Sequence, residues 1–207
     1  MDAWQMTDNE RTAFADLTDS LTPAQWDQLS LCTGWRVRDV VGHVADTDPN
    51  LGKALLTLAR YGFRLNTMID REAKRLGSQA TDQLSRDLRT TVGIHKAVGG
   101  KGEDMVMETI VHQQDVRRPL GIAREYPADE MKVALDRAAG MGNSLVPGKK
   151  RIKDLRLRAT DLDWEHGDGA EVTGPAEALL MAMAGRTQAL SDLSGPGLDT
   201  LRKRIGG

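Results

Sequence analysis

Three side chains of this sequence could together hold a divalent metal ion: His43, Glu108 and His112. Two imidazoles and one carboxylate leave a coordination position open, as in catalytic zinc sites, whereas structural zinc is usually closed by four ligands rich in cysteine. The chain has one cysteine, Cys32, so a site closed by several cysteines is excluded. If the three side chains converge, the sequence predicts a metal site that is open to a substrate.

The spacing of Glu108 and His112 supports this prediction in part. The two residues are i and i+4 within a predicted helix over 103–119, so they project from the same face of that helix. The face lies opposite Val106 and Ile110 on the helical wheel. Periodicity alone would therefore also allow this polar face to point toward solvent.

The other candidate ligand, His43, belongs to a second predicted helix over 37–55, with a bend expected at Asp48-Pro49 because proline cannot continue the hydrogen bonding. A histidine beside a stripe of valines is also typical of a hydrogen-bonded packing residue. Asp46 and Asp115 are candidates to accept hydrogen bonds from the second ring nitrogens of ligand histidines. The alternative is that both are surface carboxylates.

Helical periodicity dominates the first two-thirds of the chain. A capping box predicts a helix from Thr7, and proline at the first helical position predicts a short one after Thr22. Further helices are expected over 64–76 and 80–97. These elements predict a mainly α protein whose first domain, residues 1–147, is a helical bundle.

The pattern changes near Gly148, after which a basic run resembles a linker. Alternating polarity over 155–160 predicts a strand, and 170–173 is a candidate returning strand that would complete a hairpin. A helix is expected from 174 to about Leu193, and a last short helix near the end. Residues 148–207 are therefore predicted to form a small α+β C-terminal domain.

Charge and composition exclude several functions. A net charge of −2 gives no global attraction to nucleic acid or to an anionic membrane, and the basic run 149–158 lacks interleaved aromatic residues. Apolar runs fall short of the roughly 20 residues of a membrane span. One cysteine and an N-terminus without the apolar core of a signal peptide predict a cytoplasmic protein.

Two motifs and the tail resemble the mycothiol-dependent maleylpyruvate isomerases, a branch of the DinB-like metalloprotein superfamily. The motifs are residues 31–43, which end in His43, and residues 108–121, with Glu108, His112 and Asp115; the tail contributes Asp163-Trp164, 174–176 and Gly185-Arg186. The resemblance implies a DinB-like four-helix bundle that holds one divalent metal, usually zinc. It also implies His43, Glu108 and His112 as the ligands. The chain departs from the family at Arg36, where threonine or serine commonly caps the helix.

The resemblance implies an enzyme that uses a mycothiol-type thiol of actinobacteria as cosubstrate. The thiol would serve isomerisation or S-transfer on a small electrophile, and Arg186 is a candidate catalytic residue that could hold a substrate carboxylate. The same ligands would also suit a metal-dependent hydrolase. A third hypothesis is a non-catalytic bundle that binds a metal or a small molecule. Nitrogen and carboxylate ligands also accept nickel, cobalt or iron, and apolar helical stripes favour a homodimer.

Overall fold

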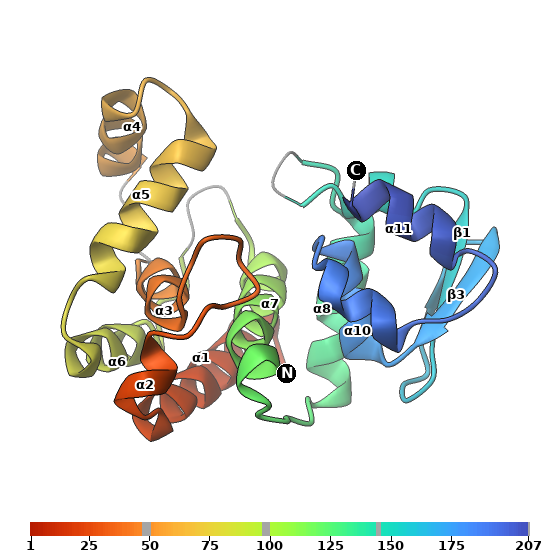
Figure 1. Ribbon diagram of the computed structural model, residues 1–207, viewed down its shortest axis with the longest axis horizontal. Coiled ribbons are helices and arrows are strands. Elements are labelled where there is room, and N and C mark those ends of the chain that lie inside the picture. The colour runs from red at the N-terminus through yellow and green to blue at the C-terminus, as the bar shows by residue number, and fades with distance from the viewer. Residues whose placement is uncertain (47–50, 97–99, 144–145, 207) are drawn as a thin grey trace. The chain divides into compact units, whose positions relative to one another are not determined.

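A computed structural model describes residues 1–46, 51–96, 100–143 and 146–206 (Figure 1). The protein is mainly helical and carries a small three-stranded sheet near the C-terminus. The predicted fold class, mainly α with strands near the C-terminus, is confirmed. The chain divides into two compact units, Met1–Ala123 and Arg124–Gly207. Among the helices of the described residues, none has both the length and the apolar character needed to cross a membrane.

The first unit consists of helices packed around one apolar core. Helix α1 contacts α6 and α7, and helix α3 contacts α5, α6 and α7. The core between them includes Phe14 of α1, Val40 of α3, Leu88 of α6 and Val116 of α7, none of them exposed. The helices are α1 (Ala3–Ser20), α2 (Pro23–Trp26), α3 (Val37–Ala45), α4 (Leu51–Arg60), α5 (Leu65–Gly77), α6 (Thr81–Thr90) and α7 (Gly102–Leu120).

Helix α1 begins one turn earlier than the capping box at Thr7 predicted. The Asp2 carboxylate accepts hydrogen bonds from the backbone N–H groups of Trp4 and Gln5, both at 2.9 Å, and so caps the helix. Thr7 lies inside the helix and donates its hydroxyl to the carbonyl of Ala3 at 2.8 Å. The predicted start at Thr7 was therefore wrong, because a stronger cap precedes it.

The remaining helix predictions for this unit agree with the structure apart from their ends. Thr22 and Gln25 cap α2 as predicted. Helix α6 ends at Thr90, before the expected residue 97, and Gly93 follows with a positive φ of 81°. The helix expected over 37–55 is observed as α3 and α4, and the bend expected at Asp48-Pro49 lies outside the described residues.

Two glycines allow α3 and α5 to approach closely. A Cβ atom added to Gly42 of α3 would lie 2.8 Å from the backbone nitrogen of Gly77 in α5. A Cβ atom added to Gly77 would collide with Asp39 of α3. Because His43 follows Gly42 directly, this contact also fixes where His43 lies relative to α5.

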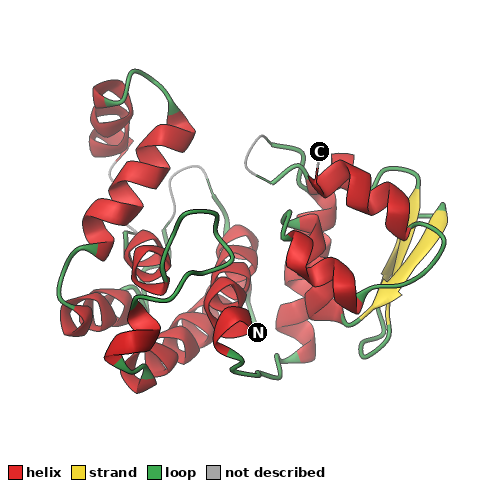
Figure 2. Ribbon diagram, in the orientation of Figure 1, coloured by secondary structure: helices red, strands yellow, loops and turns green. Residues whose placement is uncertain are grey.

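The second unit packs helices against one face of its sheet (Figure 2). Helix α10 contacts both β1 and β3. The paired strand residues Leu157 and Val172 are fully buried, as are Leu179 and Leu180 of α10. The elements are α8 (Ala128–Gly140), α9 (Gly148–Arg151), β1 (Leu155–Ala159), β2 (Glu165–His166), β3 (Ala170–Gly174), α10 (Ala176–Met183), the 3₁₀ helix η1 (Thr187–Asp192) and α11 (Leu198–Gly206).

The sheet differs from the predicted hairpin. Its strand order is β2-β1-β3, in which β1 pairs with β2 antiparallel and with β3 parallel. The chain crosses from one edge of β1 to the other through Gly167 and Gly169, whose backbones pass directly against those of Leu155 and Asp154. The prediction that 170–173 forms a hairpin with 155–160 was therefore wrong.

The helix expected from 174 to about Leu193 is also interrupted. Helix α10 ends at Met183, and Gly185 adopts a positive φ of 94°. A Cβ atom at Gly185 would lie 2.5 Å from the Arg151 guanidinium, so the chain leaves the helix where only glycine fits. Arg186 therefore precedes η1 and is not inside a continuous helix.

The two compact units meet between Ala123 and Arg124, and the boundary expected between the functional domains, at residues 147 and 148, stays a prediction. Helix α8 belongs to the second unit, where it contacts α9 and α10. The sequence around 148 marks a change from helix to strand, but the packing of α8 decides to which unit this helix belongs.

Candidate metal centre

The three predicted ligands come together between α3 and α7. Their donor atoms all lie within 4.8 Å of one another. Nε2 of His43 is 3.7 Å from Oε1 of Glu108. The rings of His43 and His112 meet edge to face, with centroids 5.1 Å apart. Ligand atoms of one tetrahedral zinc ion are about 3.3 Å apart, so the donor types and their separations fit a divalent cation after small side-chain movements.

The polar face of α7 is only partly exposed to solvent. Helix α7 contacts both α1 and α3. The His112 side chain is 13% exposed and that of Glu108 is 38% exposed. The candidate ligand face is therefore more exposed at Glu108 than at His112.

His112 is held by Asp115 of the same helix. Nδ1 of His112 lies 2.9 Å from Oδ2 of Asp115, whose side chain is fully buried. Burial alone would lower the pKa of His112, but the interactions with Asp115 and Cys32 outweigh it and raise the pKa to about 10. Because Asp115 engages Nδ1, Nε2 is the nitrogen that remains for a metal.

Cys32 completes this arrangement from the loop before α3. Its thiol donates a hydrogen bond to Oδ2 of Asp115 at 3.0 Å, and its sulfur lies 3.9 Å from Nδ1 of His112. Cys32, His112 and Asp115 form a second group of possible metal donors. Within this group, His112 and Cys32 lie 2.9 and 3.0 Å from the Asp115 carboxylate, which are hydrogen-bond distances. The sequence pattern gave no signal for this contact, because it joins residues 83 positions apart.

Trp35 supports the other histidine. The indole contacts the His43 ring edge to face, with centroids 5.2 Å apart. Its Nε1–H donates to Oδ1 of Asp70 in α5 at 3.0 Å, which fixes the ring plane. The loop between α2 and α3 therefore supplies one contact to each histidine, through Trp35 and Cys32.

The departure at Arg36 is compensated from within the helix. Oδ2 of Asp39 accepts the backbone N–H of Arg36 at 2.9 Å, and the Arg36 guanidinium pairs with Asp39 at 3.3 Å. This satisfies the backbone N–H at the N-cap even though Arg36 has no side-chain oxygen to cap the first turn. Helix α3 consequently begins at Val37 and carries His43 in its last turn.

A family model matches the first part of the chain. Residues 7–94 match the family model described as "Mycothiol maleylpyruvate isomerase N-terminal domain". The match includes His43 and ends before α7. The resemblance read from the sequence is thus confirmed for residues 7–94, which contain the first candidate ligand.

The fold agrees with a solved isomerase over most of the chain. The crystal structure of a histidine-to-alanine mutant of the mycothiol-dependent maleylpyruvate isomerase matches with a TM-score of 0.56, over 94% of this chain and 91% of that chain. The two sequences are 13% identical, so the match shows a shared fold. No curated protein matches the chain significantly.

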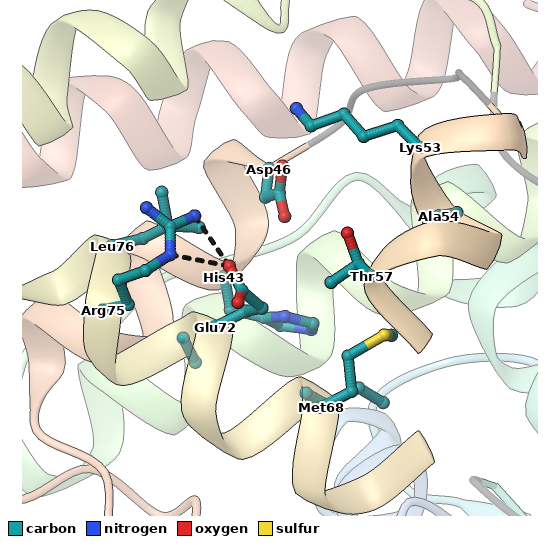
Figure 3. A pocket seen from close by; sticks show the side chains of 11 residues that line it. His43, Asp46, Lys53, Ala54, Thr57, Met68, Glu72, Arg75 and Leu76 are labelled. Carbon is teal, nitrogen blue, oxygen red and sulfur yellow. Dashed lines mark hydrogen bonds and ion pairs between the residues drawn. The ribbon is translucent and has the colours of Figure 1, made fainter. Parts of the chain in front are cut away.

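A pocket of about 240 Å³ opens beside His43 within the first unit (Figure 3). It lies among α3, α4 and α5. Its apolar lining includes Ala54, Met68 and Ile69, and its polar lining includes Asp46, Lys53 and Thr57. The pocket therefore offers an apolar wall and several polar groups next to a candidate ligand. Sequence periodicity gave no signal for it, because α4 and α5 meet only in the tertiary structure.

A hydrogen-bond network stiffens one wall of this pocket. Glu72 accepts a bond from the Tyr61 hydroxyl at 2.8 Å and from Nε of Arg75 at 2.7 Å, drawn for Arg75 in Figure 3. Burial raises the pKa of Glu72, but these two partners outweigh it and hold the pKa below its usual value. Tyr61 follows α4, so the network joins the end of α4 to α5.

The other predicted candidates are Arg186 and Asp46, and His95 is a further histidine of the first unit. Arg186 belongs to the second unit, where its Nη1 donates to the carbonyl of Ala184 at 2.9 Å. Its catalytic role remains a prediction. His95 pairs with Asp8 at 2.7 Å on the surface and is not one of the three candidate ligands. Asp46 caps the end of α3 and lines the pocket beside His43.

Proposed function

We propose that the protein is a metal-dependent enzyme that uses a mycothiol-type thiol for isomerisation or S-transfer on a small electrophile. The convergence of His43, Glu108 and His112, with donor atoms within 4.8 Å of one another, carries this proposal. The match of residues 7–94 to the mycothiol maleylpyruvate isomerase N-terminal domain supports the thiol and the reaction class.

In this proposal the three side chains hold one divalent ion, and zinc suits their nitrogen and carboxylate donors. A bound cation of this kind favours the thiolate form of a thiol, which is the nucleophilic form. Asp115 keeps Nδ1 of His112 engaged and thereby presents Nε2 to the ligand position. Trp35 restrains the ring of His43 by its edge contact.

The reaction needs no protein nucleophile. The thiol loses its proton to solvent, and sulfur bonds to one carbon of an activated double bond while the π electrons move to the activating group. Rotation about the remaining single bond, followed by cleavage of the carbon–sulfur bond, re-forms the double bond in the other geometry and returns the thiolate. Protonation of the adduct before cleavage would instead leave a thioether, which is S-transfer.

The pocket beside His43 is the place that we propose for the electrophile. Its volume of about 240 Å³ is below the ~300–1,000 Å³ of pockets for drug-sized ligands. It would enclose a compact electrophile, whereas a larger thiol would extend beyond it. Met68 and Ile69 provide apolar contact, and the Lys53 and Thr57 side chains provide polar groups.

Two further features belong to this proposal. Arg186 would hold a substrate carboxylate through its guanidinium, so changing Arg186 to lysine should raise KM for the electrophile and leave metal content unchanged. A homodimer in the cytoplasm is the proposed state of the protein. Sedimentation at several concentrations measures the oligomeric state.

Metal content of tag-free protein purified without chelator tests the proposal. We expect about one equivalent of zinc in the wild type and in a His95→Ala control, but not in His112→Ala. Thiol transfer should be lost together with the metal. Undiminished transfer after loss of the metal, or no metal uptake even with added zinc, would contradict the proposal.

Cobalt substitution separates an enzyme from a binding protein. Thiol should change the visible spectrum of the cobalt form if it reaches the metal, and this change should disappear with chelator. A cobalt form that ignores every thiol would support a non-catalytic binding role. Thiol-independent hydrolysis by the same form would support a hydrolase.

A further inference from the structure

Asp115 accepts two hydrogen bonds through the same oxygen atom. Nδ1 of His112 lies 2.9 Å from Oδ2 of Asp115, and the Cys32 sulfur lies 3.0 Å from it. The carboxylate is completely buried, so water does not compete freely for this oxygen. The orientation of Asp115 thus depends on both partners, and the orientation of His112 depends on Asp115.

The backbone around Cys32 fixes where its thiol lies. The Cys32 N–H donates to Oγ of Ser30 at 3.1 Å, and the Cys32 carbonyl accepts the N–H of Trp35 at 2.9 Å. The N–H of Leu31 donates to the carbonyl of Asp115 at 3.0 Å, which ties the loop directly to α7. The thiol therefore meets the carboxylate because the loop is anchored on the helix that carries two candidate ligands.

The position of the thiol distinguishes among its possible roles. It lies on the Nδ1 side of the His112 ring, 3.9 Å from that nitrogen, and Nδ1 is engaged by Asp115. The metal proposed above would bind the opposite nitrogen, Nε2, together with His43 and Glu108. A residue on the Nδ1 side acts on the metal through the histidine and its carboxylate.

We propose that Cys32 is a positioning residue, whose S–H bond to Asp115 orients the carboxylate that in turn orients the metal ligand His112. The inference rests on the proposed metal site. It assigns Cys32 neither as a ligand nor as a nucleophile. Removing the thiol would leave the buried carboxylate with one partner fewer and a small void beside it.

Metal affinity measured by competition with a chromogenic chelator provides the first test. Changing the hydrogen-bonding neighbours of metal ligands typically costs about 10- to 100-fold in affinity. We expect Cys32→Ala to weaken zinc and cobalt binding about tenfold, and Cys32→Ser, which keeps a donor, to stay within about threefold of wild type. Equal affinity in all three proteins would overturn the inference.

A double-mutant cycle separates positioning from simple packing. If Cys32 acts through Asp115, Cys32→Ala should change metal affinity little in an Asp115→Asn background, because the carboxylate that it orients is already gone. An equal loss in both backgrounds would mean that Cys32 acts independently of Asp115. Thermal unfolding of each metal-free variant shows whether the variant is folded at the temperature of the affinity measurement. If Cys32→Ala is unstable, the metal affinity of Cys32→Ser is compared between the two backgrounds instead.

The absorption of the cobalt-loaded protein tests the alternative of direct ligation. A cysteine ligand would produce an intense sulfur-to-cobalt charge-transfer band in the near ultraviolet, lost in Cys32→Ala. We expect no such band before an external thiol is added. Its presence would overturn the inference and would indicate that Cys32, His112 and Asp115 bind the metal directly. Failure of the wild type to bind any metal would instead refute the proposed function, so the two outcomes are distinguishable.

Discussion

His112 and Asp115 lie one helical turn apart on α7, and Nδ1 of His112 is 2.9 Å from Oδ2 of Asp115. The carboxylate is buried and the histidine is nearly so. This pair keeps a proton on Nδ1 and turns Nε2 toward the other candidate ligands. It also raises the pKa of His112 far above that of an ordinary histidine, to about 10, against the effect of burial.

Metal binding should release a proton from His112. In the metal-free protein the raised pKa of about 10 keeps His112 protonated on both nitrogens at neutral pH. A metal at Nε2 must displace one of these protons. The contribution of His112 should therefore make the apparent metal affinity rise about tenfold per pH unit between pH 7 and 9.

Competition titrations at several pH values measure this slope. Asp115→Asn removes the charge that raises the pKa, so the variant should show a shallower slope, although it binds the metal more weakly. Identical slopes in the two proteins would argue against a protonated His112. Calorimetry in buffers of different ionisation enthalpy counts the released protons independently.

The stability of the metal-free protein should also depend on this pair. The folded-state pKa of His112, about 10, lies above its ordinary value of 6.5. The resulting stabilisation is fully present below pH 6.5 and is lost as the pH rises through 10. Asp115→Asn should therefore lower the free energy of unfolding more at pH 6 than at pH 10.5. Urea unfolding in the presence of chelator measures both differences, and equal losses at the two pH values would rule this linkage out.

Filling the pocket beside His43 should impair electrophile binding and spare the metal. Met68 lines the pocket, and tryptophan at this position would occupy much of the volume of about 240 Å³. We expect Met68→Trp to raise KM for the electrophile by at least about tenfold. Leu56→Trp is the matched control, because Leu56 is 75% exposed and does not line the pocket.

Metal content and thiol binding should be unchanged in both of these variants. A normal KM in Met68→Trp would place the electrophile elsewhere. Loss of metal in Met68→Trp would mean that the pocket wall supports His43 and does not bind substrate.

The contact between α3 and α5 should not tolerate a side chain at Gly42. A Cβ atom there meets the backbone of Gly77 at 2.8 Å, so one helix must move. Such overpacking costs about 1–3 kcal/mol, and we expect Gly42→Ala to lower the free energy of unfolding by this amount. Gly140→Ala is the control, because a Cβ atom there meets nothing within 4 Å. Denaturant unfolding measures both, and similar stabilities would show that the helices adjust without cost.

Local sequence accounts for much of the fold. Helix α7 could be predicted because its apolar periodicity and the Gly121 C-cap depend on neighbouring residues alone. The relation of Glu108 to His112 follows from helical geometry in the same way. The capping motif at Thr7 gave the wrong start for α1, because Asp2 caps the helix one turn earlier.

The sequence by itself determined the helices, the shared face of Glu108 and His112, and the motif that resembles the isomerase domain. Only the tertiary structure decided that His43 meets this face, that Cys32 reaches Asp115, and that α4 and α5 enclose a pocket. These relationships join residues distant in the chain, and they depend on which surfaces bury the most apolar area together. The parallel pairing of β1 with β3 was settled in the same way: alternating polarity marks a strand, but its neighbours are chosen by the packing of the whole unit.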